Sequence, residues 1–231
     1  MHARTPKALV MELVEEGFGR GDASVFERIV AEGYVQHNPS LPSGRAGLRA
    51  MLAAVQALRD SSFLPVRMIA DSQYVVLHSD WRAEGLRRAV FDLFRVQDGW
   101  LIEHWDAMQD QPADCDLLAG TTEVGDRTQT PATVATVATF MEQLLAGHPA
   151  GDGDAMIDHG IPPLADTRVH YRRLHRLVGE GHFAFTQCEG RRAHEPVALY
   201  DLFRVSPSGI AERWNVTQAI PNEAANRNGI F

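Results

Sequence analysis

The sequence predicts an α+β fold that is built twice, with helices packed on an antiparallel sheet in each half. The first observation is an internal repeat, because residues 91–96 (FDLFRV) return as residues 200–205 (YDLFRV). The offset is 109 positions, and it is the same for Trp105 and Trp214. An ungapped repeat of this kind indicates a duplicated domain. The second observation is that helical periodicity precedes strand alternation in the chain, an order typical of α+β domains.

Length and composition set limits on the function. The chain has 231 residues, enough for two small domains, and 45% of them are hydrophobic, as in globular proteins. A formal net charge of −8 argues against nonspecific binding to nucleic acid or to an anionic membrane. No apolar run approaches the roughly 20 residues that cross a bilayer, and no signal peptide is recognisable. Cys115 and Cys188 lack metal-ligand spacing, which favours a reduced, cytoplasmic protein.

The first copy begins with helices. Apolar residues at helical spacing predict a helix over residues 6–19, Asp22 can cap a second helix, and Gly44 opens a third. Residues 34–39 (YVQHNP) form a short extended piece that ends at a proline turn. Residues 98–99 (DG) are typical of a two-residue hairpin turn. Alternating apolar residues predict three or four strands, at about 66–70, 73–82, 88–96 and 100–110.

The second copy is shorter than the first. Residues 113–131 are rich in Gly, Thr, Asp and Ala and are predicted to link two domains, over residues 1–112 and 132–231. Residues 156–159 (MIDH) are the counterpart of residues 34–37, but the interval that follows is too short for the third helix, which we expect to be missing. Strands are predicted at about 168–178, 182–190, 196–205 and 209–219.

Charged residues on two strands are the first candidates for chemistry. Asp92 alternates with large apolar residues and shares a strand face with Phe94, where its charged form is costly to bury. His104, Asp106 and Met108 share a face of the next strand, and a histidine and an aspartate two positions apart can form an acid–base pair. The alternatives are a structural ion pair for Asp92 and a solvent-wetted pair for the other two.

Two further histidines are candidates. His37 follows the extended piece, and an ordinary histidine pKa near 6.5 suits a base, although a turn histidine bonded to backbone near Pro39 is equally compatible. His78 lies among apolar residues, where a lone histidine is more often a satisfied core residue. These two could join His104 and Asp106 as metal ligands, but no pair has a diagnostic spacing, so we expect no metal and no cofactor.

Several segments resemble the SnoaL-like branch of the nuclear-transport-factor-two-like superfamily, which includes ketosteroid isomerases and polyketide cyclases. The resemblance implies a cone, in which helices pack on a curved antiparallel sheet around a deep pocket. It also implies that Asp92 lies on the strand that carries the pocket aspartic acid of ketosteroid isomerase, and that an acid–base aspartate comes from the region of Asp106. The segments that carry the resemblance include residues 34–39, 91–96, 103–106, 171–176 and 228–231.

The resemblance and these residues together predict a cofactor-independent enzyme that moves a proton next to a carbonyl of a small apolar molecule. The reaction would be an aldol-type cyclisation, an isomerisation or a dehydration. His37 or Asp106 would be the base, Asp92 would stabilise the enolate oxygen, and His104 would assist. The alternatives are a noncatalytic module for ligand binding or dimerisation, and an epoxide or ester hydrolase. The expected substrate contacts are Tyr34, Asn38, His78, Phe94 and Met108.

The two copies differ at the candidate positions. Asn215 stands in the second copy where the first has Asp106, and an amide cannot exchange a proton as a carboxyl group does. We therefore expect the first copy to hold the active site and the second to be mainly structural. The second copy would then act as a built-in partner in an intramolecular pseudo-dimer, and a homodimer stays open. At the constant offset, His78, His104 and Asp106 become Gln187, Arg213 and Asn215, whereas Asp92 is retained as Asp201.

Overall fold

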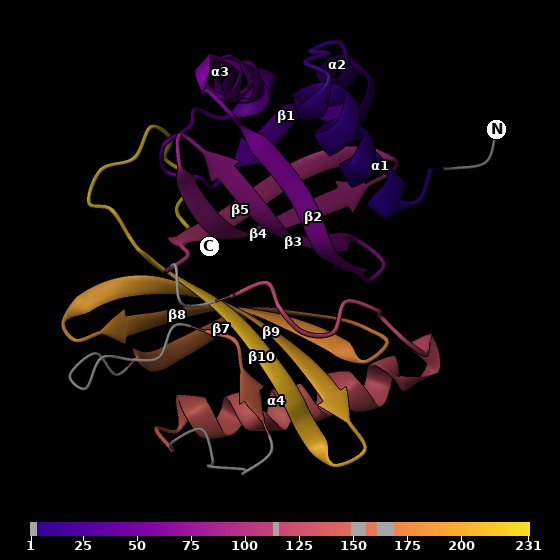
Figure 1. The fold of residues 1–231 in the computed structure, drawn as a ribbon, viewed down its shortest axis with the longest axis vertical. Coiled ribbons are helices and arrows are strands. Elements are labelled where there is room, and N and C mark those ends of the chain that lie inside the picture. Colours follow the sequence, from indigo (N-terminus) through magenta and orange to yellow (C-terminus); the bar gives the residue numbers. More distant parts are fainter. Residues whose placement is uncertain (1–3, 113–115, 149–155, 161–168) are drawn as a thin grey trace. The chain divides into compact units, whose positions relative to one another are not determined.

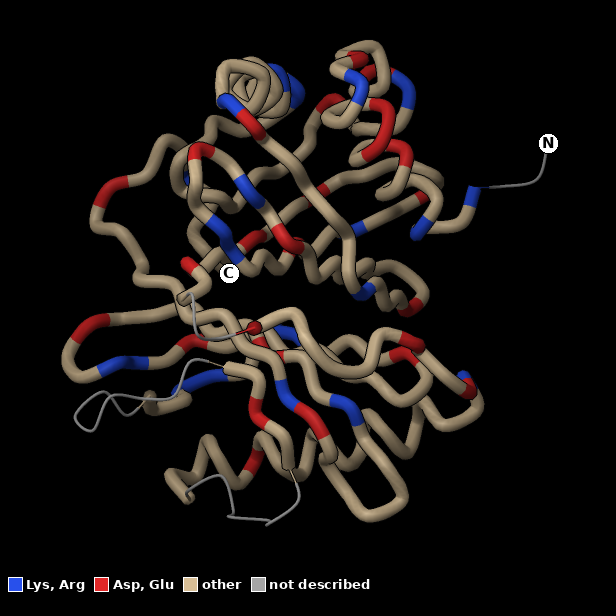
Figure 2. The backbone as a smooth tube through the Cα atoms, viewed as in Figure 1, with Lys and Arg blue, Asp and Glu red and all other residues tan. Residues whose placement is uncertain are grey.

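The computed structural model contains two α+β units, each built around a five-stranded sheet (Figure 1). It describes residues 4–112, 116–148, 156–160 and 169–231. The duplication and the α+β class predicted from the sequence are both confirmed. Residues of both charge signs are interspersed along each unit (Figure 2). Within the described segments, no helix is long and apolar enough to span a membrane.

The helices of the first unit lie close to their predicted positions. Helix α1 (Pro6–Glu12) begins after Thr5, whose hydroxyl accepts a hydrogen bond from the backbone N–H of Ala8, and it continues as a π-helical segment, Leu13–Gly19. The shorter helix α2 (Val25–Ile29) and the helix α3 (Gly44–Ala57) follow. These helices supply the apolar side chains that cover one face of the sheet.

The first sheet has the strand order β1-β5-β4-β3-β2. It is mixed rather than wholly antiparallel, because β1 reaches the edge by a long connection and runs parallel to β5. Asp98 and Gly99 both have positive φ, as a two-residue hairpin turn requires. Pro65 lies inside the edge strand β2, where a missing N–H donor is tolerated. The strands are β1 (Val30–Gln36), β2 (Ser62–Ala70), β3 (Tyr74–Ala83), β4 (Leu86–Gln97) and β5 (Trp100–Asp110).

The two faces of this sheet have different roles. Leu77 of β3 lies opposite Asp92 of β4, and His78 lies opposite Phe91. Cross-strand partners share a face and successive residues alternate, so Asp92 lies on the face of Leu77 and His78 lies on the other. Leu77 and Phe94 belong to the core that the helices form. Asp92 therefore points to the helix-covered face.

The second unit repeats the sheet with the order β6-β10-β9-β8-β7. Helix α4 (Thr130–Leu145) packs Val137 and Met141 against Leu199 and Phe203 of this sheet. It is the one α-helix in the described part of the unit. The region in which the third helix is expected to be missing includes residues 161–168, which lie outside the described residues. The strands are β6 (Ile157–Asp158), β7 (Val169–Glu180), β8 (Phe183–Arg192), β9 (Glu195–Ser206) and β10 (Gly209–Ala219).

Backbone hydrogen bonds identify the second copy's counterpart of His37. The N–H of His37 donates to the carbonyl of His104 at 2.9 Å, and the N–H of His159 donates to the carbonyl of Arg213 at 2.8 Å. His104 and Arg213 are related by the repeat, so His37 and His159 are equivalent. The spacing differs from 109 there because the intervening segments differ in length.

The C-terminal segment groups with the first unit, although the sequence predicts it as the end of the second domain. The first unit comprises Met1–Asp106 together with Pro221–Phe231, and the second is Ala107–Ile220. The Asn226 amide donates to the carbonyl oxygen of Asn38 at 2.8 Å, and the Asn228 amide donates to that of Gln36 at 2.8 Å. These bonds attach the segment to the end of β1.

Removing this attachment should destabilise the first unit. Asn226→Ala deletes an amide that bonds the carbonyls of Asn38 and Leu41 at 2.8 and 2.9 Å. We expect its free energy of unfolding to fall by about 1–2 kcal/mol, because two acceptors lose their partner. Urea-induced unfolding measures the change, with exposed Asn222→Ala in the same segment as the control. Equal stability of the two variants would contradict the attachment.

Candidate functional site

A buried cluster of charged side chains lies on the helix-covered face of the first sheet. Strand β4 supplies Asp92 and strand β5 supplies His104 and Asp106, which are 8%, 3% and 7% exposed. Each of the three offers a nitrogen or oxygen atom that lies within 4.8 Å of the others. The structure therefore brings together three of the four residues that the sequence suggests as catalytic.

Strand β1 and the residues after it complete the cluster. Tyr34, Gln36 and Asn38 are buried and stand two positions apart, so strand alternation directs all three to one side. The Asn38 amide donates to Oδ2 of Asp106 at 2.7 Å. Gln36 is absent from the residues that the sequence analysis selected. The sequence could have identified Gln36, because it lies two positions from both Tyr34 and Asn38 and so shares their side of the strand.

Hydrogen bonds fix the tautomer of His104. Its Nε2 lies 3.0 Å from Oδ1 of Asp92, and its Nδ1 lies 3.0 Å from Oε1 of Gln36. That Gln36 oxygen also accepts the backbone N–H of Asn38 at 2.9 Å, so it is an acceptor and Nδ1 must donate to it. One proton is then left to be shared between Nε2 and the carboxyl group of Asp92.

Burial and neighbouring charges perturb two groups in the cluster. Burial raises the pKa of Asp106 and the charge of Asp92 adds to this, while His104 and Asn38 act against it. Burial alone would lower the pKa of His104, but the hydrogen bond to Asp92 and the charges of Asp106 and Asp92 outweigh it, so this pKa is raised. The surroundings favour a protonated His104 beside Asp92, and they favour retention of a proton on Asp106.

Three polar atoms of the cluster are buried without a hydrogen-bond partner among the described residues. They are the hydroxyl oxygen of Tyr34, Nε2 of Gln36 and Oδ2 of Asp92. An unpaired buried polar atom lowers stability by about 1–3 kcal/mol, and native proteins contain few of them. A bound molecule with matching polar atoms would satisfy all three.

His37 does not join the cluster. Its neighbours Gln36 and Asn38 point to the cluster, so alternation turns His37 to the opposite side. There its Nδ1 lies 2.8 Å from the carbonyl oxygen of Gly229 and its Nε2 lies 2.8 Å from Oε1 of Glu103. Both ring nitrogens are therefore occupied, and the expected convergence of His37 with Asp92 and Asp106 does not occur.

The other expected substrate contacts also separate into two groups. Phe94 lies against His104, with ring centroids 4.5 Å apart, and borders the cluster. His78 lies on the opposite face, where it stacks on Phe91 at 4.2 Å and bonds to Arg67. Met108 groups with the second unit. Tyr34 and Asn38 belong to the cluster itself, and their contact with a substrate stays a prediction.

The four side chains that the sequence analysis considered as metal ligands do not converge, because His37 and His78 lie on the face opposite His104 and Asp106. In the described parts of the chain, Asp92, His104 and Asp106 are the group that offers metal-ligand atoms in close proximity. Both ring nitrogens of His104 already make hydrogen bonds. A metal ion bound through Nε2 would have to displace the bond to Asp92.

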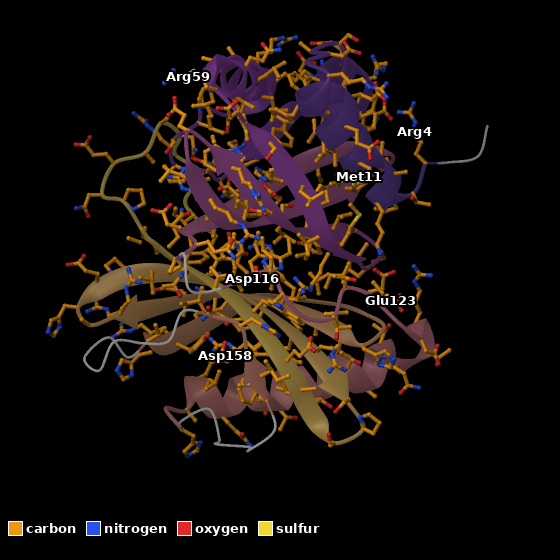
Figure 3. The ribbon with its side chains drawn as sticks, in the orientation of Figure 1. Arg4, Met11, Arg59, Asp116, Glu123 and Asp158 are labelled. Carbon is orange, nitrogen blue, oxygen red and sulfur yellow. The ribbon has the colours of Figure 1, made fainter. Side chains whose placement is uncertain are left out.

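The equivalent position in the second unit is occupied by an ion pair. Asp201 is fully buried, and its Oδ1 accepts hydrogen bonds from Nε and Nη2 of Arg213 at 3.0 and 2.8 Å. Its Oδ2 accepts from the Tyr171 hydroxyl at 2.9 Å. Arg213 also pairs with Asp158, the labelled residue of β6 in Figure 3. Burial raises the pKa of Asp201 and Arg213 opposes the increase. Both carboxylate oxygens have partners within the fold.

A family model described as the SnoaL-like domain matches residues 10–104 of this chain. The matched segment lies within the first unit and contains the β1 residues, Asp92 and His104. No curated protein matches the chain.

Solved structures align with about half of the chain. TsrD from Streptomyces laurentii is 22% identical, with a TM-score of 0.39 over 46% of this chain and 92% of its own. IdmH from Streptomyces antibioticus, a candidate polyketide cyclase, is 20% identical, with a TM-score of 0.41 over 46% and 93%. A candidate ketosteroid isomerase from Kribbella flavida DSM 17836 is 19% identical, with a TM-score of 0.39 over 50% and 88%.

The titration of His104 should reflect its hydrogen bond to Asp92. Its folded-state pKa lies above the ordinary value of about 6.5, so the resulting stabilisation is complete below that pH and is lost as the pH rises through the folded value. The loss is about 1.4 kcal/mol for each pH unit by which the pKa is raised. An NMR titration of the imidazole measures the pKa directly. In Asp92→Asn the pKa should fall, because the hydrogen bond to the Asp92 carboxylate and its charge are both lost, and an unchanged value would contradict the contact between the two groups.

The two buried aspartates should differ in their importance for stability. Asp201→Asn leaves the Arg213 guanidinium buried without its main counter-charge, so we expect a loss of about 3 kcal/mol in the free energy of unfolding. Asp92→Asn is the matched control, and its loss should be smaller because His104 can release its proton near neutral pH. Urea-induced unfolding compares them. A larger loss in Asp92→Asn would contradict this difference.

Proposed function

We propose that the first unit, which contains the segment matched by the SnoaL-like family model, uses its buried cluster to transfer protons next to a carbonyl group of a small apolar molecule without a cofactor. The observation that carries the proposal is the 3.0 Å contact between Asp92 and His104, with Asp106 in the same interior. Aldol-type cyclisation, isomerisation and dehydration all begin with such a transfer. The first unit would perform it.

Asp92 is the base in this proposal. Its Oδ1 faces His104, whereas its Oδ2 is buried without a partner among the described residues and can receive a proton. His104, held by Gln36, keeps the Asp92 carboxylate oriented and balances its charge. Oδ2 takes a proton from the carbon next to the carbonyl, and the electron pair of the C–H bond moves toward the carbonyl oxygen. This assignment replaces His37, whose ring nitrogens bond elsewhere.

Asp106 is the acid in this proposal. Burial and the nearby Asp92 raise its pKa, so it holds a proton that it can give to the carbonyl oxygen as negative charge develops there. The Asn38 amide accompanies the change, because it bonds to Oδ2 of Asp106 and stabilises the carboxylate that is left. Return of the proton from Asp92 to a different carbon completes an isomerisation, and proton release from the enol oxygen to Asp106 resets the site.

Apolar residues around the cluster favour an apolar substrate. Phe94 lies against His104, and it belongs to the same buried core as Leu77 and Phe26. Such surroundings exclude water and strengthen the electrostatic effect of each charged group. In the second unit, Arg213 occupies the equivalent of the His104 position and Asn215 that of Asp106. A guanidinium cannot take up a further proton and an amide cannot supply one, so the second unit is assigned a structural role.

The proposal can be tested without knowing the natural substrate. A panel of small ketones and 1,3-diketones is incubated with the protein in deuterium oxide, and NMR follows exchange of the hydrogens next to the carbonyl. The unmodified protein should accelerate exchange for some members of the panel. Asp92→Asn and Asp106→Asn should each reduce the rate by about 100-fold or more.

Asn215→Ala is the matched control, because Asn215 is the second-unit equivalent of Asp106. It should leave the exchange rate unchanged. An equal loss in this variant, or full activity in Asp106→Asn, would contradict the proposal. Binding of panel members without exchange would support a ligand-binding module. Entry of labelled solvent oxygen into products of epoxides or esters would support a hydrolase.

A further inference from the structure

We infer that the Tyr34 hydroxyl and the Gln36 amide nitrogen form a binding site for one oxygen atom of the ligand, in the form of a carbonyl oxygen or the anion derived from it. The inference rests on the proposed function for the chemical identity of the ligand. It assigns two residues that the proton-transfer steps do not use as donors, and it restricts the ligand to molecules that place an accepting oxygen beside an acidic C–H bond.

The first argument is that both donors are buried and unpaired. Tyr34 and Gln36 are each 1% exposed. The Tyr34 hydroxyl oxygen and Nε2 of Gln36 have no hydrogen-bond partner among the described residues. The orientation of the Gln36 amide is fixed, because its oxygen accepts from both His104 and the backbone of Asn38. Its two N–H groups are therefore available for a ligand.

The second argument is the shared direction of the two side chains. Tyr34 and Gln36 stand two positions apart on β1, so they project to the same side of the strand. Gln36 contacts His104 directly. Asn38, two positions further on, donates to Asp106, so the side of the chain that carries Tyr34 and Gln36 borders the buried carboxyl groups. Both donors thus belong to the cluster that contains the proposed base and acid.

The third argument is electrostatic. Burial raises the pKa of Tyr34 well above its ordinary value, so the hydroxyl keeps its proton and can act as a donor. With a proton on Asp106, and with His104 and Asp92 as an ion pair, the formal charge of the cluster is zero. A ligand oxygen that becomes negative is then not repelled by a net negative charge, and fixed donors stabilise it.

The unpaired atoms also describe the ligand. Among the unpaired atoms of the cluster, Tyr34 and Gln36 supply donors and Oδ2 of Asp92 supplies an acceptor. An enolisable ketone or ester complements this set, because its oxygen accepts two hydrogen bonds while its neighbouring C–H group faces a base. A ligand that offers only hydrogen-bond donors would leave the N–H groups of Gln36 unsatisfied.

The second copy lacks this donor pair. The pairing of β6 with β10 makes Asp158 the equivalent of Gln36, because they face Arg213 and His104 respectively. Two positions earlier, Met156 replaces Tyr34. A thioether and a carboxylate donate no hydrogen bond at neutral pH. The first unit therefore contains both the donor pair and the proposed acid and base, and the second unit lacks the donor pair.

Binding of 4-nitrophenol tests the inference, because its phenolate presents an anionic oxygen, changes absorbance on binding and undergoes no turnover. Tyr34→Phe should weaken binding about tenfold or more, because a hydrogen bond to an anion is lost. Gln36→Glu keeps an oxygen for His104 and Asn38 but removes the N–H donors, and it should weaken binding at least as much.

The matched controls are Tyr74→Phe and Gln73→Glu, which make the same changes outside the cluster in the first unit. Binding to these variants should stay within about twofold of the unmodified protein, since no donor to the ligand is lost. If Tyr34→Phe and Gln36→Glu bind 4-nitrophenol as tightly as the unmodified protein does, the inference is overturned. Absence of binding of both 4-nitrophenol and 2-naphthol to the unmodified protein would also overturn it.

A second measurement uses only the unmodified protein, so it tests the inference even if Tyr34→Phe does not fold. A tyrosine hydroxyl bonded to a phenolate should give a far-downfield proton resonance that appears on binding, and its absence at saturation would overturn the inference. Failure here is distinct from failure of the proposed function. If the protein catalyses deuterium exchange but Tyr34→Phe and Gln36→Glu bind the phenol normally, the proposed proton transfer stands and the oxygen site is rejected. If these variants bind the phenol weakly but the unmodified protein catalyses no exchange, the oxygen site stands and the proton transfer is rejected.

Discussion

The hydrogen bond between Asp92 and His104 is the interaction on which the site depends. A lone carboxylate on the helix-covered face of the sheet would be costly to bury, and the imidazole reduces that cost without removing the capacity to exchange a proton. Gln36 fixes the ring through Nδ1, which leaves one proton to be shared with Asp92. Burial, together with the charge of Asp92, raises the pKa of Asp106 and favours a proton on this carboxyl group, which also accepts a hydrogen bond from Asn38.

The duplicated chain contains two different ways to bury the same aspartate. In the first unit a titratable histidine is the partner, and three polar atoms are left unpaired. In the second unit Arg213 and Tyr171 bond to both carboxylate oxygens of Asp201. The guanidinium of Arg213 does not release a proton near neutral pH. The same fold thus buries the aspartate beside a titratable imidazole in one unit and beside a guanidinium in the other, and the exchange of His104 for Arg213 is one of several differences at these positions.

Much of this could be predicted from the sequence, because strand alternation and the repeat are local signals. They identified the strands and placed His104 and Asp106 on one face. Alternation continued through β1 would also have selected Gln36 and excluded His37. The face of His78 could not be predicted, because it depends on whether β3 pairs that residue with Phe91 or with Asp92. The attachment of the C-terminal segment depends on hydrogen bonds between residues far apart in sequence, which leave no local pattern.

Neutron diffraction from a deuterated crystal of the full chain would test the central claim most directly, because it locates the protons of the buried cluster. Near neutral pH, the account predicts deuterons on both ring nitrogens of His104 and on the carboxyl group of Asp106, with none on Oδ2 of Asp92. A bare Asp106 carboxylate beside a neutral His104 without a deuteron on Nδ1 would contradict it, since neither the acid nor the oriented base would then exist.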